Sequence, residues 1–379
     1  MNPLDLPFDA DEMLAGLKHW VECESPTWDA DAVNRMLDLA ARDLALMGAR
    51  VERIAGAREP SGVMMGGMVR ADLPHPRTGE PGITIMGHLD TVHPVGTLAV
   101  NPFRRDGDKC LGPGICDMKG GNYLALEALR KLARAGIETP LPVRVLFTPD
   151  EEIGSPTSRA LIEAEAARAK YVLIPEPGLQ GGGVTTGRYA IARYNLKTTG
   201  KPSHAGARLS EGRSAIREMA KRVLQIEEMT TDACTFSVGV FHAGRWVNCV
   251  SSEARAEALS MAKRQEDLDR GVTAMLALTD AETGFEVTRG LTRPVWEPSE
   301  ATLALAARVE RLHKAVGLGF SHKSQGGGSD GNFTGAMGVP TIDGLGVEGD
   351  GIHTLGEHID VPSLPARARV FAALLAELD

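Results

Sequence analysis

Histidine and carboxylate residues recur in this chain at one kind of position, directly after an apolar run typical of a β-strand. In open α/β sheets, the carboxyl ends of the strands form the crevice that receives a ligand. Side chains that follow separate strands would therefore converge on one place. The residues concerned are His88 and Asp90 after ITIMG, Asp117 in GPGICDMKGG, Asp150, Glu151 and Glu152 after VRVLFTP, Glu176 in YVLIPEPG, and His353 in GVEGDGIHT.

The types of these side chains point to metal chemistry. These residues form five sites along the chain, and one ligand from each would give two histidines and three carboxylates, a mixed nitrogen and oxygen set that suits zinc, with cobalt or manganese as substitutes. One metal would need only three such ligands, so five of them predict two metals, about 3.5–4 Å apart, that share a bridging carboxylate. Asp90 stands two residues after His88 and could orient its imidazole through the second ring nitrogen. Each residue alone is more often structural, so the prediction depends on their conjunction.

The elements that must position these residues alternate between strands and helices. This alternation predicts an α/β fold, with a mostly parallel sheet covered by helices on both faces. The predicted strands are residues 62–69, 83–86, 143–147 and 171–174, and the predicted helices are residues 32–47, 122–135 and 158–168.

The pattern changes near residue 188. Strand and helix periodicities then follow in the order β-α-β-β-α-β, which predicts a small ferredoxin-like α+β module with one half-exposed sheet face. After residue 300 the α/β pattern returns. We therefore expect a metal-binding domain of residues 1–188 and 296–379, interrupted by an inserted module of residues 189–295.

Composition excludes several classes of protein. The chain has 379 residues and a net charge of −9, which argues against a nucleic-acid partner, since such proteins usually carry a basic patch. No apolar run approaches the roughly 20 residues of a membrane span, and the acidic N-terminus does not resemble a signal peptide. The five cysteines are scattered without a C-x-x-C pair, which predicts free thiols. We expect a soluble cytoplasmic protein without a membrane partner.

Along nearly its whole length, the chain resembles the two-zinc peptidase family of glutamate carboxypeptidase, aminoacylase, acetylornithine deacetylase and succinyl-diaminopimelate desuccinylase. The motifs GHLDTVHPVG, GPGICDMKGG, TPDEEIGSPTSR, PEPG, KPSHAG and GIHT stand in the family's order. The segments NPFRRDGDKCLGPGICDMKGG and GGGSD look most like the bacterial glutamate carboxypeptidases. The resemblance implies two zinc ions per subunit and a small-molecule substrate.

The resemblance also implies a role for each ligand. His88 and Glu176 would bind one metal, and Glu152 and His353 would bind the other. Asp117 would bridge the two metals.

Catalytic roles are implied for three further residues. Asp90 would be the partner of His88, and Glu151 would be the general base that passes a proton from water to the leaving nitrogen. The inserted module would be a lid that also builds a homodimer. His204, in KPSHAG, would stabilise the oxyanion, often from the neighbouring subunit. Without the resemblance, His204 would be taken for a histidine in a surface turn.

Substrate contacts are implied for Asn248 in RWVNCVS, Arg293 in LTRPVWE, and Gly327 and Gly328 in QGGGSD. An arginine fork fits a carboxylate bidentately, although Arg293 would also suit an exposed position before a proline. Two departures from the family pattern concern the same module. The proline usual after the asparagine is absent, and the usual Asp-x-Arg is Leu259-Ser260-Met261. These departures favour a pocket that accepts a less charged or more apolar group beside Arg293.

The predicted function is metal-dependent cleavage of an amide bond in a small carboxylate-bearing substrate, namely an N-acyl amino acid, an amino-acid conjugate or a dipeptide. A hydrolase of a specialised aromatic amide or amine is an alternative on the same scaffold. A catalytically silent metal-binding homologue is another, but the presence of Glu151 beside Glu152 argues against it. A nucleotide-binding enzyme is disfavoured because GPGICDMKGG lacks the spacing of a phosphate-binding loop.

Overall fold

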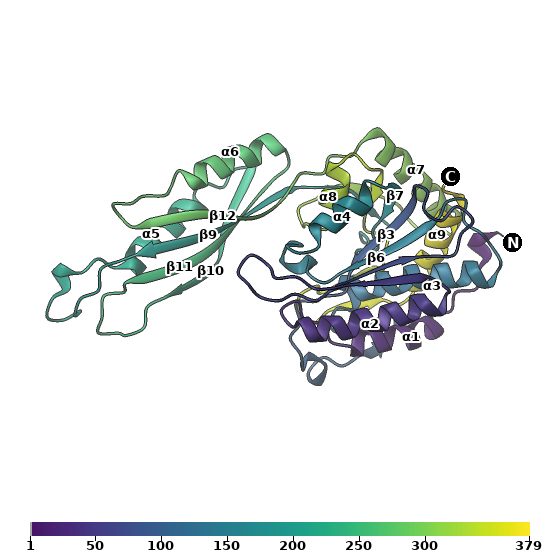
Figure 1. Cartoon of the computed structure of the whole chain (residues 1–379), viewed down its shortest axis with the longest axis horizontal. Coiled ribbons are helices and arrows are strands. Elements are labelled where there is room, and N and C mark those ends of the chain that lie inside the picture. Colours follow the sequence, from purple (N-terminus) through teal and green to yellow (C-terminus); the bar gives the residue numbers. More distant parts are fainter. Residues whose placement is uncertain (1) are drawn as a thin grey trace. The chain divides into compact units, whose positions relative to one another are not determined.

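The computed structural model describes residues 2–379 and divides them into two compact units, which are treated separately (Figure 1). Unit 1 comprises the chain up to Gly187 together with Glu297–Ser324 and Ser329–Asp379. Unit 2 comprises Arg188–Trp296 and Gln325–Gly328.

Unit 1 is built on a mixed six-stranded sheet with the strand order β1-β2-β6-β3-β7-β14. The last four of these strands run parallel, whereas β1 pairs with β2, and β2 with β6, in antiparallel fashion. The predicted fold class, a mostly parallel mixed sheet flanked by helices, is confirmed. The strands are β1 (Arg50–Ile54), β2 (Met68–Asp72), β3 (Gly82–His88), β6 (Val143–Thr148), β7 (Ala169–Leu173) and β14 (Thr341–Ile342).

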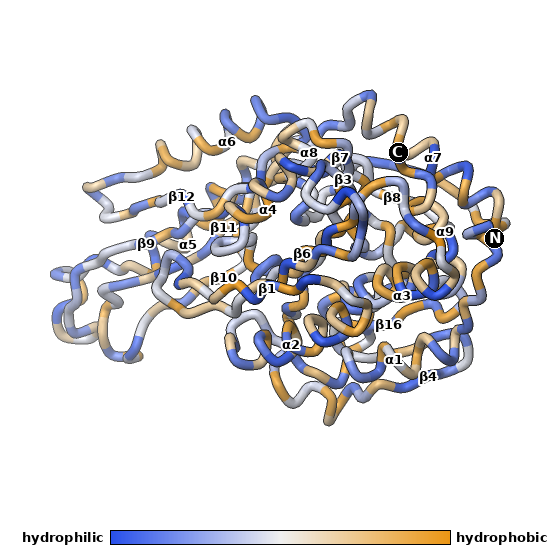
Figure 2. Tube along the Cα trace, turned by 45° about the vertical axis from the view of Figure 1, so that its right-hand side comes forward, coloured by the Kyte–Doolittle hydropathy of each residue, from blue (hydrophilic) through white to orange (hydrophobic). Residues whose placement is uncertain are grey.

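The helices of unit 1 pack on the sheet and on one another. Asp9, Asp29 and Ser299 each accept a hydrogen bond from the backbone N–H three residues later, which caps the start of α1, α2 and α7. Apolar and polar residues alternate along α1 and α2 (Figure 2), as expected of helices with one buried face. The helices are α1 (Ala10–Glu22), α2 (Ala30–Leu46), α3 (Gly120–Arg134), α4 (Arg159–Ala166), α7 (Glu300–Ala315), α8 (Gly331–Ala336) and α9 (Ser363–Glu377).

Alternate residues of β3 enter two different hydrophobic clusters. Ile83 and Ile85 pack into the larger cluster, which includes residues of α1, α3 and α9. Met86 packs into a smaller cluster with Ile162 of α4 and Phe333 of α8. Every residue of β3 is buried, so its sequence is mainly apolar and does not alternate with exposed polar residues.

A second sheet in unit 1 is antiparallel and has the order β15-β16-β5-β4. Its strands are β4 (Arg104–Asp106), β5 (Lys109–Leu111), β15 (Gly349–Asp350) and β16 (His358–Asp360). The loop that holds Asp117 follows β5, and the loop that holds His353 joins β15 to β16. The pairing of β16 with β5 therefore brings these two loops together. Two further strands, β8 (Val184–Arg188) and β13 (His322–Gln325), form a two-stranded sheet.

One strand prediction was wrong. Of residues 62–69, only Met68 and Val69 belong to a strand. A Cβ atom at Gly66 would lie 2.8 Å from a methyl group of Val33, and one at Gly67 would lie 2.3 Å from the carbonyl oxygen of Ile54. The two glycines thus allow a close approach between segments instead of continuing β2.

Unit 2 has the predicted β-α-β-β-α-β order and forms an antiparallel sheet with the strand order β10-β11-β9-β12. Its two helices pack against the sheet, and the buried side chains between them form a separate hydrophobic cluster (Figure 1). The elements are β9 (Ala190–Thr199), α5 (Ala215–Glu227), β10 (Cys234–Ala243), β11 (Glu253–Ala262), α6 (Gln265–Leu276) and β12 (Phe285–Arg293).

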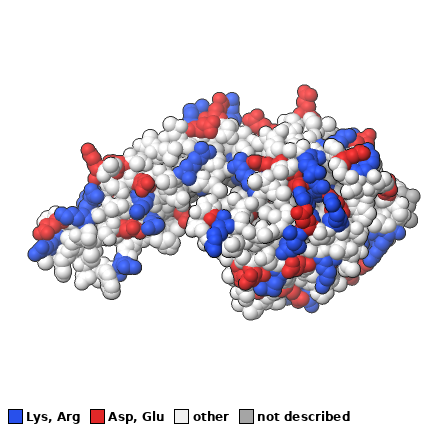
Figure 3. Space-filling model, viewed as in Figure 1, with Lys and Arg blue, Asp and Glu red and all other residues white. Residues whose placement is uncertain are grey.

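Charges of both signs are mixed on the surface. On the face in Figure 3, lysine and arginine are interspersed with aspartate and glutamate over both units. Within residues 2–379, no helix combines the length and the apolar character that crossing a membrane requires.

Candidate metal centre

His88 is the last residue of β3 and is 1% exposed. Its Nδ1 lies 2.9 Å from the carbonyl oxygen of Asp90 and 3.4 Å from Oδ1 of the same residue. Its Nε2 lies 3.1 Å from Oδ1 of Asp117 and 3.7 Å from Oε1 of Glu176. One ring nitrogen therefore faces Asp90, and the other faces two carboxylates.

His353 approaches the same Asp117 from the other carboxylate oxygen. Its Nε2 lies 3.3 Å from Oδ2 of Asp117 and 3.1 Å from Oε2 of Glu152. His353 has a φ of 64°, in the left-handed region that non-glycine residues seldom adopt. Asp117 thus has one carboxylate oxygen beside each histidine.

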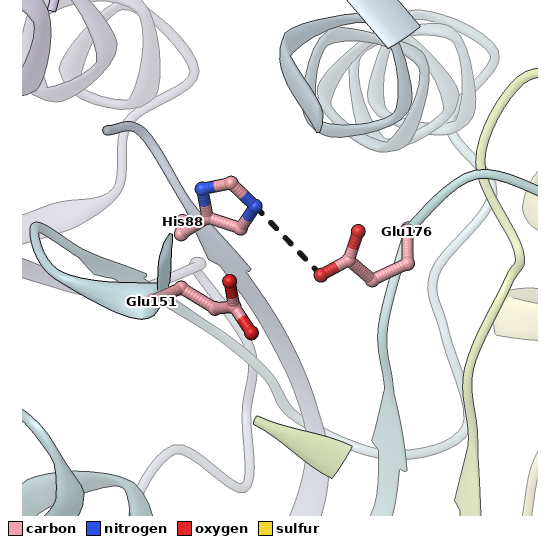
Figure 4. A group of neighbouring side chains, drawn as sticks. All are labelled: His88, Glu151 and Glu176. Atoms are coloured by element: carbon pink, nitrogen blue, oxygen red, sulfur yellow. Dashed lines mark ion pairs between the residues drawn. The ribbon is translucent and has the colours of Figure 1, made fainter. Parts of the chain in front are cut away.

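Glu151 belongs to the same cluster. Figure 4 shows His88, Glu151 and Glu176, which come from three separate segments and are directed toward a common space. One ligand atom from each lies within 4.8 Å of the other two, and the same is true of His88, Asp117 and Glu152. These distances do not decide whether Glu151 is a metal ligand or a general base next to the metal, because a carboxylate in this position could serve as either.

The fully buried Asp90 fixes the segment that carries the two glutamates. Its Oδ1 accepts a hydrogen bond from the backbone N–H of Glu151 at 3.2 Å, and its Oδ2 accepts one from that of Glu152 at 3.3 Å. The hydroxyl of Thr27 also donates to Oδ2, at 2.8 Å. Asp90 therefore links the ring of His88 to the backbone of Glu151 and Glu152.

The crowding of carboxyl groups shifts pKa values across the cluster. Burial, reinforced by the neighbouring Asp117, raises the pKa of Glu176 well above its ordinary value, and burial likewise raises the pKa of Glu152. Hydrogen bonds to Asp117 and Glu152 raise the pKa of His353 to about 10. Burial opposes ionisation of Asp117, but its two histidine partners outweigh this and lower its pKa. Negative charge is thus concentrated here beyond what the histidines neutralise.

This donor set fits divalent cations. Imidazole and carboxylate donors without thiolates suit zinc, cobalt or manganese. Metal ligands bind in their deprotonated forms, so a bound cation would oppose the burial that raises the pKa values of Glu152 and Glu176. The two oxygens of Asp117, each near a different histidine, match the geometry required of a carboxylate between two metals.

Two of the predicted residues lie together in unit 2. His204 and Asn248 are both exposed, and the backbone N–H of Ala205 donates to the carbonyl of Asn248 at 3.0 Å. Nδ1 of His204 accepts hydrogen bonds from the N–H groups of Gly206 and Ala207, each at 3.1 Å, which fixes the orientation of the ring. Sequence spacing gave no sign that these segments, more than 40 residues apart, are neighbours.

Arg293 ends β12 and is buried, so the interpretation of it as an exposed arginine was wrong. A Cβ atom at Gly328 would lie 2.8 Å from Cδ of Arg293, so the glycine allows the arginine to lie against the backbone. The guanidinium of Arg188 donates to the carbonyl of Gly327 at 2.8 Å. The sequence did not indicate that Arg188 contacts the glycine run, because this arginine belongs to no recognisable motif.

Comparison with known proteins agrees with this geometry. The model of the family described as "Peptidase family M20/M25/M40" matches residues 84–377. Carboxypeptidase G2 of Pseudomonas sp. is 33% identical over 374 residues, which cover 96% of this chain and 88% of that protein. Succinyl-diaminopimelate desuccinylase of Thioalkalivibrio sulfidiphilus is 24% identical over 320 residues, covering 79% of this chain and 84% of that protein.

A solved structure shares the fold. Aminopeptidase PepT of Bacillus cereus superposes with a TM-score of 0.74 at 23% identity, covering 97% of this chain and 98% of that one. The family match over most of the chain and the 33% identity to carboxypeptidase G2 show that the protein belongs to peptidase family M20/M25/M40 and is a metal-dependent hydrolase of the carboxypeptidase-like type.

Proposed function

We propose that this protein is a di-zinc hydrolase that cleaves the amide bond of a small carboxylate-bearing substrate. The observation that carries the proposal is the position of Asp117, with one oxygen 3.1 Å from His88 and the other 3.3 Å from His353. His88 and Glu176 would hold one metal and Glu152 and His353 the second, and Asp117 would be a ligand of both.

A bound pair of metals supplies Lewis-acid chemistry, which polarises the substrate carbonyl and lowers the pKa of water. The protein's own residues then move the proton. Glu151 accepts a proton from the attacking water as the water oxygen bonds to the carbonyl carbon. It returns this proton to the amide nitrogen as the C–N bond breaks, which yields a carboxylic acid and an amine. Asp90 keeps both His88 and the backbone of Glu151 in place.

Roles toward the substrate are also proposed for residues of unit 2. His204 stabilises the oxyanion, Asn248 contacts the substrate, and Arg293 binds the substrate carboxylate beside Gly327 and Gly328. The hydrogen bonds that orient the exposed ring of His204 support its role, because they fix the ring before substrate arrives. The contact of Arg293 with Gly328 supports the role of Arg293, because it holds the arginine beside the glycine run.

A homodimer through unit 2 is part of the proposal. β10 is an edge strand whose C-terminal half is exposed. Large apolar side chains lie on and just after it, namely Val240, Phe241, Trp246 and Val247, and Trp246 is 72% exposed. Edge strands and apolar patches favour association, so a second copy of the chain would bury this surface.

The named relatives favour a substrate with an amino-acid leaving group. Carboxypeptidase G2 matches nearly the whole chain, and the names of succinyl-diaminopimelate desuccinylase and acetylornithine deacetylase describe removal of an acyl group from an amino acid. N-acyl amino acids, amino-acid conjugates and dipeptides are therefore the proposed class.

The test is hydrolysis of a panel of N-acyl amino acids, dipeptides and aromatic amides by metal-free protein and by protein reloaded with zinc, cobalt or manganese. Metal-dependent release of a free amino acid would support the proposal. Cleavage only of amides without a carboxylate would instead identify a specialised aromatic amide hydrolase. Two bound metals with no cleavage of any compound would indicate a catalytically silent homologue.

A further inference from the structure

A buried carboxylate, that of Glu357, contacts the backbone of the proposed ligand Asp117 but lies outside the proposed ligand set. Glu357 is 1% exposed. Its Oε1 accepts hydrogen bonds from the backbone N–H groups of Cys116 at 2.8 Å and Asp117 at 3.0 Å. Its Oε2 accepts one from the N–H of Gly114 at 2.9 Å and lies 2.6 Å from Nε2 of His93. Three N–H groups of one loop thus converge on a single carboxylate, as in backbone anion sites.

The loop that Glu357 binds is the one that carries Asp117. Gly114 has a φ of 68°, and both Asp117 and Met118 have non-helical backbone angles. A loop of this kind directs its N–H groups away from any helix or strand partner, and buried N–H groups need acceptors. Glu357 supplies the acceptor for three of them, including that of the proposed bridging ligand itself.

Glu357 also joins the segments that carry the other ligands. It stands four residues after His353, and its carbonyl accepts a hydrogen bond from the N–H of Gly112 at 3.3 Å, which extends the pairing of β16 with β5. His93 stands three residues after Asp90, in the segment that follows β3. One side chain therefore ties together three ligand-bearing segments that are far apart in the sequence.

We propose that Glu357 is a positioning residue of the metal centre, which fixes the backbone of Asp117 so that its two oxygens face His88 and His353. This inference rests on the proposed function, because it assigns a role toward the same metals. Loss of an outer contact that orients metal ligands typically weakens metal binding about 10–100-fold. Glutamine would keep the shape of the side chain but replace one acceptor oxygen by an NH₂ group that faces N–H donors.

The matched control is Glu165, another buried glutamate of unit 1. It accepts a hydrogen bond from Arg70 at 2.7 Å and forms an ion pair with Arg144, which lies near the amino end of β6. His88, Glu152 and Glu176 lie at or after the carboxyl ends of strands of the six-stranded sheet, so Glu165→Gln removes a buried carboxylate at the other end of that sheet. Both variants should lower the melting temperature of the metal-free protein.

Zinc affinity distinguishes the two variants. Competition with a chromophoric chelator should show that Glu357→Gln binds at least one zinc ion about 10–100-fold more weakly than wild type. Glu165→Gln should keep the wild-type affinity. Wild-type affinity of Glu357→Gln for both ions, whatever its melting temperature, would overturn the inference alone. A wild-type protein that binds no zinc, cobalt or manganese would overturn the proposed function as well.

A second pair of variants tests the inference if Glu357→Gln does not fold. His93→Gln keeps an amide N–H that can donate to Glu357, whereas His93→Ala removes the donor. We expect His93→Gln to bind zinc within a factor of about three of wild type and His93→Ala to bind it about tenfold more weakly. Equal zinc affinity for the two His93 variants would contradict the positioning role of Glu357.

Discussion

At the scale of single residues, the proposed centre depends on carboxylates whose two oxygens bind different partners. Asp117 has one oxygen near each histidine. Asp90 accepts the N–H of Glu151 on one oxygen and that of Glu152 on the other. Because each carboxylate oxygen has its own lone pairs, one side chain can join two segments. Replacing a carboxylate by an amide removes such a role without removing the side chain, and this makes amides the most informative substitutions here.

Glu151→Gln should separate catalysis from metal binding. The amide cannot accept the proton of the attacking water, so turnover should fall about 10²–10⁴-fold. Zinc content should stay at the wild-type value, because the proposed ligands remain. Turnover is measured on the best substrate of the panel and zinc by elemental analysis, with the exposed Glu310→Gln as control. Near-normal turnover would remove Glu151 as the base, and loss of one zinc would identify it as a ligand.

A buried histidine away from the centre predicts a pH dependence of stability. His313 of α7 is fully buried, and burial together with the nearby Arg367 lowers its pKa to about 4. The folded protein therefore binds this proton less readily than the unfolded chain, whose histidine titrates near pH 6.5. The free energy of unfolding should fall as the pH decreases from about 6.5 toward 4, by up to about 3 kcal/mol from this residue.

Urea unfolding of the metal-free protein at pH 7 and pH 5 measures this effect. His313→Gln removes the titrating group, so its loss of stability between the two pH values should be smaller than that of wild type. An equal loss in both proteins would show that other groups account for the pH dependence.

At the scale of elements, the sequence predicted those parts of the fold that depend on local patterns. The continuous apolar run of β3 and the helical spacing of α2 and α3 gave both type and position within a few residues. The prediction of a strand at residues 62–69 failed because Gly66 and Gly67 serve contacts with distant residues, which no local pattern records. For the same reason the pairing of β16 with β5, which brings Asp117 and His353 together, could not be predicted from periodicity.

The sequence predicted the proposed metal ligands but not the residues that hold those ligands in place by hydrogen bonds. Asp117 and His353 stood out because of their motifs, whereas Glu357 and His93 looked like ordinary polar residues of a loop. Their roles come from hydrogen bonds across more than 200 residues of sequence. Motif spacing can identify side chains that do chemistry, but the hydrogen bonds that hold those side chains depend on tertiary packing.

The glycine run next to β12 offers a test at this scale. A Cβ atom at Gly328 would lie 2.8 Å from both Cδ of Arg293 and Cδ1 of Ile191, whereas one at Gly327 would meet only Arg188, at 3.5 Å. Gly328→Ala should therefore displace Arg293 and raise KM for carboxylate substrates about 10–100-fold, the range expected for a lost charge-assisted hydrogen bond. Gly327→Ala is the comparison: its Cβ atom would not contact Arg293, so it should raise KM less than Gly328→Ala does. Equal KM values for the two variants would argue against Arg293 as the carboxylate anchor.

At the scale of the whole molecule, the residues with proposed catalytic and binding roles are divided between the two compact units. The metal ligands and Glu151 belong to unit 1, whereas His204, Asn248 and Arg293 belong to unit 2. The family resemblance implies a histidine at His204 that often serves the neighbouring subunit, and we propose this role for it in a homodimer. Activity would then depend on dimer formation, because each site would combine Glu151 of one chain with His204 of the other chain.

Mixing two inactive variants tests this dependence. His204→Asn should lose most turnover but keep its zinc, and Glu151→Gln should do the same for a different reason. In a heterodimer of the two, one site combines an intact Glu151 with an intact His204 from the partner. Random exchange of subunits makes about half of the dimers heterodimers, each with one of its two sites restored, so the mixture should regain about a quarter of wild-type turnover. A mixture that gains no activity, although light scattering and subunit exchange show that mixed dimers have formed, would place His204 in the active site of its own chain.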